Sequence, residues 1–153
     1  MRTSVNVAVQ AGALTAFVVL RFTAPGWLLI ILILTVAGPV VLAVPTVLSL
    51  ATLRRRELSG LVTAPFLACA GFLLLGGATM PDFGDTEDSV RAPVQVLLEG
   101  AGLGAGPVEP LYVLGSLAVA GWAASLVWLV VALVVDTRRA HRVAGPPHPA
   151  WAV

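Results

Sequence analysis

The residues best suited to chemistry are four carboxylates that lie within one short stretch around a glycine: Asp82, Asp85, Glu87 and Asp88. Ca²⁺ takes about six to eight oxygen ligands in proteins, so a loop of this kind could wrap a calcium ion. The spacing lacks the alternate acidic positions and the closing Glu of an EF-hand. We therefore expect a solvated acidic loop, keep Ca²⁺ binding as the less favoured alternative, and predict no other metal and no cofactor.

Other reactive residue types do not form a recognisable pattern. Cys69 is the single cysteine and lies in an apolar run, which excludes a Cys-x-x-Cys redox centre. His141 and His148 both lie near the C-terminus without metal-ligand spacing. An intramembrane hydrolase needs a nucleophile with a base, paired aspartates or a zinc motif, and we find none. The sequence therefore predicts a protein that is not an enzyme, and arginine clusters confined to the ends of apolar runs give no support for nucleic-acid binding.

The composition requires a lipid environment. The chain is 58% hydrophobic and 11% charged, with a mean hydropathy of +0.96, whereas soluble domains carry about 25% charged residues. A hydrophobic stretch of about 20 residues spans a bilayer. The apolar runs predict an all-α bundle of four transmembrane helices at about 5–20, 27–53, 59–79 and 111–135. Residues 81–110 form the predicted outer loop, with a short helix over Pro93 to Glu99, and 143–153 a flexible proline-rich tail.

Arginine clusters predict the orientation of this bundle. Arg54, Arg55 and Arg56 separate the second and third spans, and Arg138 and Arg139 follow the fourth. Short loops rich in arginine stay in the cytoplasm, so both termini are expected inside. On this topology the cytoplasmic side carries seven arginines against two carboxylates, and the outer side carries two arginines against six carboxylates.

Small residues recur at helical spacing on two of the predicted spans. Such ridges let helix backbones approach closely in lipid, so we predict a helix–helix seam on each span. The third span carries Gly60, Ala64, Ala68 and Gly71, and the fourth carries Gly115, Ala118, Gly121 and Ser125. Trp122 and Trp128 lie deep within the fourth span, where we expect them to fill gaps between helices.

The second span is longer than a bilayer requires and contains two prolines, so we expect a kink around Gly38 and Pro39, with Pro45 as a second weak point. Thr35, Gly38, Pro45 and Ser49 share one stripe, which favours a kinked helix packed on a neighbour over a broken helix lining a substrate path.

The first span is the weakest, and a signal peptide is its competing interpretation because Arg2 precedes it. Asn6 and Gln10 interrupt its apolar run and share a face, and we expect this face to point into the bundle or the inner headgroup region.

The charged residues are all expected in loops, at interfaces or in the tail. Ion-coupled transporters usually keep an ionisable residue inside the membrane, so this distribution argues against one. The favoured interpretation is a non-catalytic accessory or scaffold protein of a bacterial plasma membrane, whose partners are the lipid bilayer and either other membrane proteins or further copies of itself. The alternative is a small homo-oligomeric pore or carrier. The bacterial assignment rests on basic residues that are all arginine and on heavy use of Ala, Gly, Val and Pro.

Overall fold

The computed structural model describes residues 1–84 and 90–143, without the side chains of 140, 141 and 143. Within these residues the chain is helical, and its extended pairing is limited to two isolated β-bridges. The elements are α1 (Thr3–Thr23), α2 (Trp27–Leu34), α3 (Ala37–Ala51), the 3₁₀ turn η1 (Thr52–Arg54), α4 (Gly60–Thr79), α5 (Pro93–Gly100) and α6 (Glu109–Val143). The short helix predicted over Pro93 to Glu99 is confirmed as α5.

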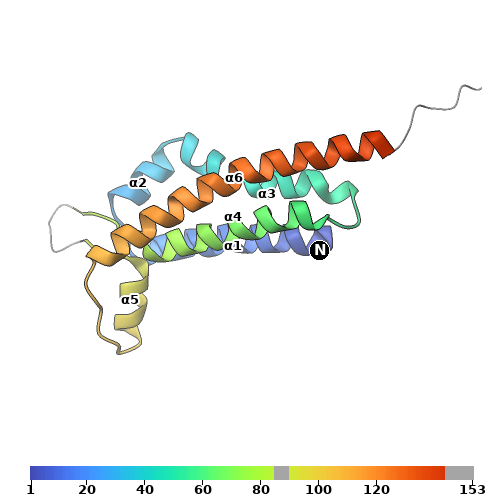
Figure 1. The fold of residues 1–153 in the computed structure, drawn as a ribbon. Helices are drawn as coiled ribbons and strands as arrows, with labels where there is room; N and C mark the ends of the chain where they lie inside the picture. The colour runs from blue at the N-terminus through green and yellow to red at the C-terminus, as the bar shows by residue number, and fades with distance from the viewer. Residues whose placement is uncertain (85–89, 144–153) are drawn as a thin grey trace, which may run out of the picture.

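Four helical segments are long and apolar enough to cross a membrane: Thr3–Thr23, Ala37–Arg54, Gly60–Thr79 and Glu109–Arg139. The four-helix prediction is therefore confirmed at this level. The segments run side by side along one axis, whereas α5 projects at the end of the bundle opposite the N-terminus (Figure 1). We call these two ends the N-terminal end and the α5 end.

The packing order places α4 at the centre. Its largest interface is with α6 and its second with α1, while α3 packs chiefly against α1. Two clusters of buried apolar side chains follow from this order. One joins α4 to α6 through Phe66, Cys69 and Leu129, and the other joins α1 to α4 through Phe17 and Leu73.

The two tryptophans of α6 have different environments. Trp122 packs against both buried clusters, as expected of a residue that fills a gap between helices. Trp128 is 47% exposed, so the same expectation was wrong for it. One face of α6 is not covered by another helix, and Trp128 lies on this exposed face.

The predicted second span is two helices. The break lies at Thr35 and Val36, and Thr35 is extended with ψ of 121°. Pro39 explains its position, because a proline ring clashes with the carbonyl four residues earlier, which here belongs to Thr35. Gly38 fits the break, since an added Cβ would lie 2.6 Å from the carbonyl oxygen of Leu32. The chain thus breaks upstream of the predicted kink, whereas Pro45 lies within α3 and is buried.

The N-terminal end is held by contacts between segments far apart in sequence. The backbone N–H of Leu58 donates to the carbonyl of Met1 at 3.0 Å. Arg55 forms an ion pair with Asp136 of α6, and the Ser59 hydroxyl donates to the same carboxylate at 2.9 Å. The start of α1, the turn before α4 and the distal part of α6 therefore meet at one end of the bundle (Figure 1).

The small-residue face of α6 packs on α4. Ala118 and Ser125 are buried, and an added Cβ at Gly115 would lie 2.7 Å from the Cα of Met80. At Gly121 the same addition would lie 2.7 Å from the Phe72 ring. These close approaches depend on the absence of a side chain at both glycines.

The predicted ridge of α4 lies elsewhere. Gly60, Ala64 and Gly71 are exposed and Ala68 is half-buried, and an added Cβ at either glycine would meet nothing within 4 Å. The face of α4 that packs inside the bundle instead carries larger residues such as Val62, Phe66 and Leu73. The ridge is therefore not part of a seam within the described chain.

The two glycine environments give a matched test of the α4–α6 seam. We expect Gly115→Ala to lower the thermal unfolding temperature in detergent, because its Cβ would push against the backbone of Met80; overpacking of this kind costs about 1–3 kcal/mol. Gly71→Ala should leave the unfolding temperature unchanged or raise it slightly, because the site is open and alanine favours helix. Equal unfolding temperatures for the two variants would contradict this description of the seam.

Candidate functional site

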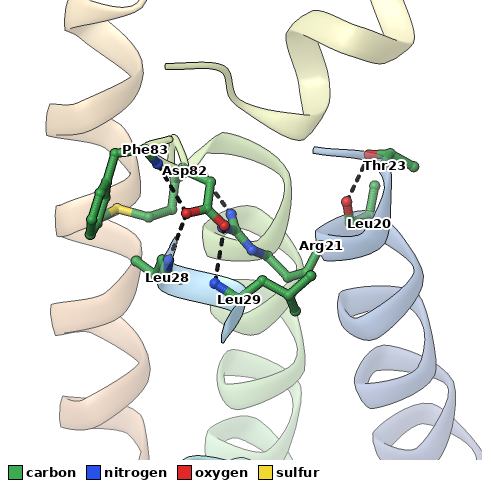
Figure 2. Close-up of polar contacts among 8 residues, drawn as sticks. Leu20, Arg21, Thr23, Leu28, Leu29, Asp82 and Phe83 are labelled. Carbon is green, nitrogen blue, oxygen red and sulfur yellow. Dashed lines mark hydrogen bonds and ion pairs between the residues drawn. The ribbon is translucent and has the colours of Figure 1, made fainter. Parts of the chain in front are cut away.

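A buried ion pair lies at the α5 end. Arg21, in the last turn of α1, is 1% exposed, and Asp82, just beyond α4, is 2% exposed. The Nη2 of Arg21 donates to Oδ2 of Asp82 at 2.5 Å. Figure 2 shows the carboxylate between this guanidinium and the beginning of α2. We call the unit of Arg21, Asp82 and the first turn of α2 the clasp.

The clasp provides hydrogen-bond acceptors for the first backbone amides of α2. The first four amides of a helix have no partner within the helix and carry partial positive charge. Leu28 N–H donates to Oδ1 of Asp82 at 2.7 Å and Leu29 N–H to Oδ2 at 3.1 Å. Trp27 N–H donates to the Phe83 carbonyl at 2.8 Å. The segment after α4 thus caps a helix some 50 residues earlier in the chain.

Both Asp82 and Arg21 have further hydrogen-bond partners, and one N–H of Arg21 has none. Asp82 Oδ1 also accepts from the Phe83 amide at 3.0 Å, so four donors surround the carboxylate. The Nη1 of Arg21 donates to the Met80 carbonyl at 2.6 Å. The Nε–H of Arg21 is buried and has no acceptor among the described residues. An unpaired buried donor costs about 1–3 kcal/mol.

Backbone contacts lock the same region to α5. Asp82 and Arg91 exchange backbone hydrogen bonds of 2.9 and 3.2 Å. Gly26 allows the close approach, since an added Cβ would lie 2.5 Å from Oδ1 of Asp82. The Gln95 side chain accepts from the Ala92 amide at 2.9 Å and donates to the Gly106 carbonyl at 2.8 Å. The ends of α1 and α4 and the starts of α2 and α5 therefore converge on Asp82.

The burial of Asp82 corrects the expectation of a solvated acidic loop at this position, and Arg21, which was expected in a loop or at an interface, is buried as well. Helix α1 continues through Thr23, so Arg21 belongs to the helix and points back into the protein. Two charges can be buried together when they pair and their remaining hydrogen-bond sites are filled. The signal in the sequence was an arginine at the end of one span and an aspartate just after another, two positions that four antiparallel spans bring to one end.

The predicted acidic loop does not provide a metal site within the described residues. Asp82 is fully engaged in the clasp, and no group of three or more His, Cys, Asp or Glu side chains that could hold a metal occurs there. The other three candidates, Asp85, Glu87 and Asp88, lie outside the described residues, as does His148. The Ca²⁺ alternative remains a prediction for that segment.

The polar groups of α1 face the bundle, as expected. Asn6 is fully buried, and the Gln10 amide donates to the Phe66 carbonyl at 2.9 Å. The arginines that predict topology lie at the N-terminal end, where Arg54, Arg56, Arg138 and Arg139 are exposed. Arg55 differs because it pairs with Asp136.

An apolar cavity of about 300 Å³ lies between α1, the α2–α3 element, α4 and α6. A second cavity of about 350 Å³ lies between α1 and the α2–α3 element, and the two share walls formed by Phe17, Arg21, Leu32 and Leu42. Both reach the clasp through Arg21. Neither could be predicted from sequence, because each results from how the broken helix lies against α1.

The clasp predicts a specific order of stability among variants. Asp82→Asn leaves Arg21 buried without a counter-charge, and removing one partner of a buried pair costs about 3–5 kcal/mol. We expect a large drop in the thermal unfolding temperature, measured by tryptophan fluorescence in detergent. The double variant Arg21→Leu/Asp82→Leu should lose less than Asp82→Asn, because no unpaired charge remains.

The exposed pair of Arg91 and Glu99, 3.1 Å apart, provides the control. Exposed pairs contribute only about 0–1 kcal/mol, so Arg91→Gln should leave the unfolding temperature nearly unchanged. A similar small effect for Asp82→Asn and Arg91→Gln would show that the clasp does not stabilise the fold.

Comparison with known protein families, curated proteins and solved structures found no match to this chain. The clasp, the exposed α4 ridge and the apolar cavities therefore have no counterpart from which a role could be transferred. Their roles are to be argued from their own geometry.

Proposed function

We propose that this protein is a non-catalytic accessory or scaffold subunit that binds other membrane proteins through the exposed ridge of α4. The observation that supports this is the open space at Gly60 and Gly71, where an added Cβ meets nothing within 4 Å. A helix from another protein could approach the α4 backbone closely at these positions.

The surroundings of the ridge fit such a contact. Helix α4 packs mainly against α1 and α6, and the face that carries Gly60, Ala64 and Gly71 is exposed. Leu61 and Leu67, which are 39% and 47% exposed, flank the small residues on this face. Small residues flanked by larger apolar ones allow the side chains of a partner helix to pack close to the α4 backbone. Van der Waals packing of this kind is a main source of helix association in lipid.

The described residues offer little to a catalytic or pore function. Cys69 is buried in the α4–α6 cluster. On the stripe proposed to line a path, Thr35 is exposed whereas Pro45 and Ser49 are buried, so its members do not share one accessible face. The Thr35 and Ser49 hydroxyls donate to carbonyls of their own helical turns. These placements favour the accessory function over a homo-oligomeric pore or carrier.

A bacterial plasma membrane is the proposed location, with the N-terminal end in the cytoplasm and α5 outside. The exposed arginines at the N-terminal end support this orientation through the positive-inside tendency. Asp82 and α5 would then lie at the outer side of the membrane.

Partner binding is tested by filling the ridge. The tagged chain, purified from native membranes in mild detergent, should carry a stoichiometric membrane-protein partner identified by mass spectrometry. The variant Ala64→Leu/Gly71→Leu should lose this partner, because larger side chains keep the partner backbone away. The control Ala120→Leu/Ala124→Leu places the same side chains on an exposed face of α6 and should retain it.

A homo-oligomer without any partner, or a partner retained equally by both double variants, would contradict the proposed docking face. In the first case, flux measured in proteoliposomes would test the pore or carrier.

The orientation is tested with single cysteines in a Cys69→Ala background. Leu103 lies near α5 and is 58% exposed. The variant Leu103→Cys should therefore react with a membrane-impermeant maleimide on intact cells. Glu57→Cys, at the N-terminal end and also exposed, should react only after permeabilisation. The reverse pattern would place the N-terminal end outside.

A further inference from the structure

Helix α5 carries its apolar and polar side chains on two different faces. Successive residues of a helix are rotated by about 100°, which places Val94, Leu97 and Leu98 on one side of α5 and Gln95 and Glu99 on the other. Leu97 is 50% exposed, and Val94 and Leu98 are half-buried. The short helix therefore presents an apolar face to the surroundings of the bundle.

Helix α5 leaves the bundle at the level where α1 and α4 end. It contacts both of these helices and runs across the direction of the long helices instead of continuing along it (Figure 1). It begins shortly after Arg91, which exchanges backbone hydrogen bonds with Asp82. Asp82 in turn accepts from Arg21, in the last turn of α1. The start of α5 is thus fixed to the ends of two membrane-spanning helices.

Hydrogen bonds also fix the rotation of α5 about its own axis. The Gln95 side chain accepts from the Ala92 amide and donates to the Gly106 carbonyl, so the polar face is bound to the segments on either side of the helix. At the other end, Gly102 has a φ of 76° and donates to the Glu99 carbonyl at 3.0 Å, a common way for a helix to end. A rotation that turned Leu97 towards the bundle would break the bonds of Gln95.

Exposed aromatic side chains mark this level as the border of the membrane. Trp27 begins α2 and Tyr112 lies in the first turn of α6, and both are exposed. Tryptophan and tyrosine are enriched where a membrane meets water. Tyr112 lies three residues, or about 4.5 Å along a helix, before Gly115, which packs on Met80 at the end of α4. The aromatic residues, the end of α4 and the start of α5 therefore lie at similar depth.

Lipid is the material next to this face of the molecule. Helix α1, which α5 contacts, exposes Val19 and Phe22 near the same end, at 58% and 59%. In a spanning helix such side chains face acyl chains. The apolar face of α5 lies beside this surface, so the lipid that surrounds α1 is already in place to cover it.

We propose that α5 is an interfacial helix that lies in the headgroup layer at the α5 end, with Val94, Leu97 and Leu98 towards the acyl chains and Glu99 towards water. Amphipathic helices of this kind place their apolar face about 5–10 Å into the boundary between headgroups and acyl chains. The exposed ion pair of Arg91 and Glu99 then remains on the hydrated side. This role requires neither the α4 ridge nor a particular side of the membrane, so it is independent of the proposed function.

The test measures the accessibility of nitroxide labels on the full chain in nanodiscs of phosphatidylglycerol and phosphatidylethanolamine. Single cysteines are introduced in a Cys69→Ala background. Leu97→Cys reports on the apolar face of α5 and Glu99→Cys on its polar face, while Val19→Cys is the lipid reference and Glu57→Cys the water reference. All four wild-type residues are exposed, so the labels do not disturb the packing of the bundle. Oxygen concentrates among acyl chains, whereas a hydrophilic nickel chelate stays in water.

The ratio of oxygen to nickel accessibility should be several-fold higher at position 97 than at position 99. Position 97 should resemble the lipid reference, and position 99 should resemble the water reference. Ratios at both positions that match the water reference would overturn the proposal and leave a partner protein as the occupant of this face. Ratios at both positions that match the lipid reference would overturn the assigned orientation, because the polar face would then be submerged as well.

Discussion

The structure depends on one carboxylate that joins distant parts of the chain. Asp82 pairs with Arg21 of α1, caps the first turn of α2 and extends from the end of α4 towards α5. A buried aspartate is costly alone, but here four donors and the positive end of a helix surround it. Without it, Arg21 would be a buried charge and the first amides of α2 would have no acceptor. The arrangement of the helices at this end therefore follows from the clasp.

The clasp also explains why the bundle is not closely packed throughout. It fixes the start of α2, and Pro39 prevents α2 and α3 from forming one straight helix. The resulting element packs against α1 and leaves apolar cavities beside it. At the opposite end, the pair of Arg55 and Asp136 holds the α3–α4 turn to α6. Between these two ends, the small residues Gly60, Ala64 and Gly71 of α4 remain exposed.

Hydrophobic runs were sufficient to predict four membrane-spanning helices, because the length and apolarity of a segment are local properties. The bounds of the second were wrong, since residues 27–53 form two helices and only Ala37–Arg54 is long enough to cross a membrane. The break at Thr35 was partly predictable, since Pro39 acts on the residue four positions earlier. The clasp was not predicted, because Arg21 and Asp82 are 61 residues apart and each resembles an ordinary residue flanking a span. The α4 ridge was predicted from its spacing, but spacing does not say whether the partner helix lies inside the chain or outside it.

The most direct measurement of the clasp is amide hydrogen exchange at Leu28 and Leu29 in nanodiscs. First-turn amides of a helix end normally exchange fast because they lack partners in the helix. If Asp82 accepts both, these two amides should exchange as slowly as those in the middle of α4. Exchange as fast as that of unpaired first-turn amides would show that Asp82 does not cap α2, and the account of how the α5 end is organised would fail.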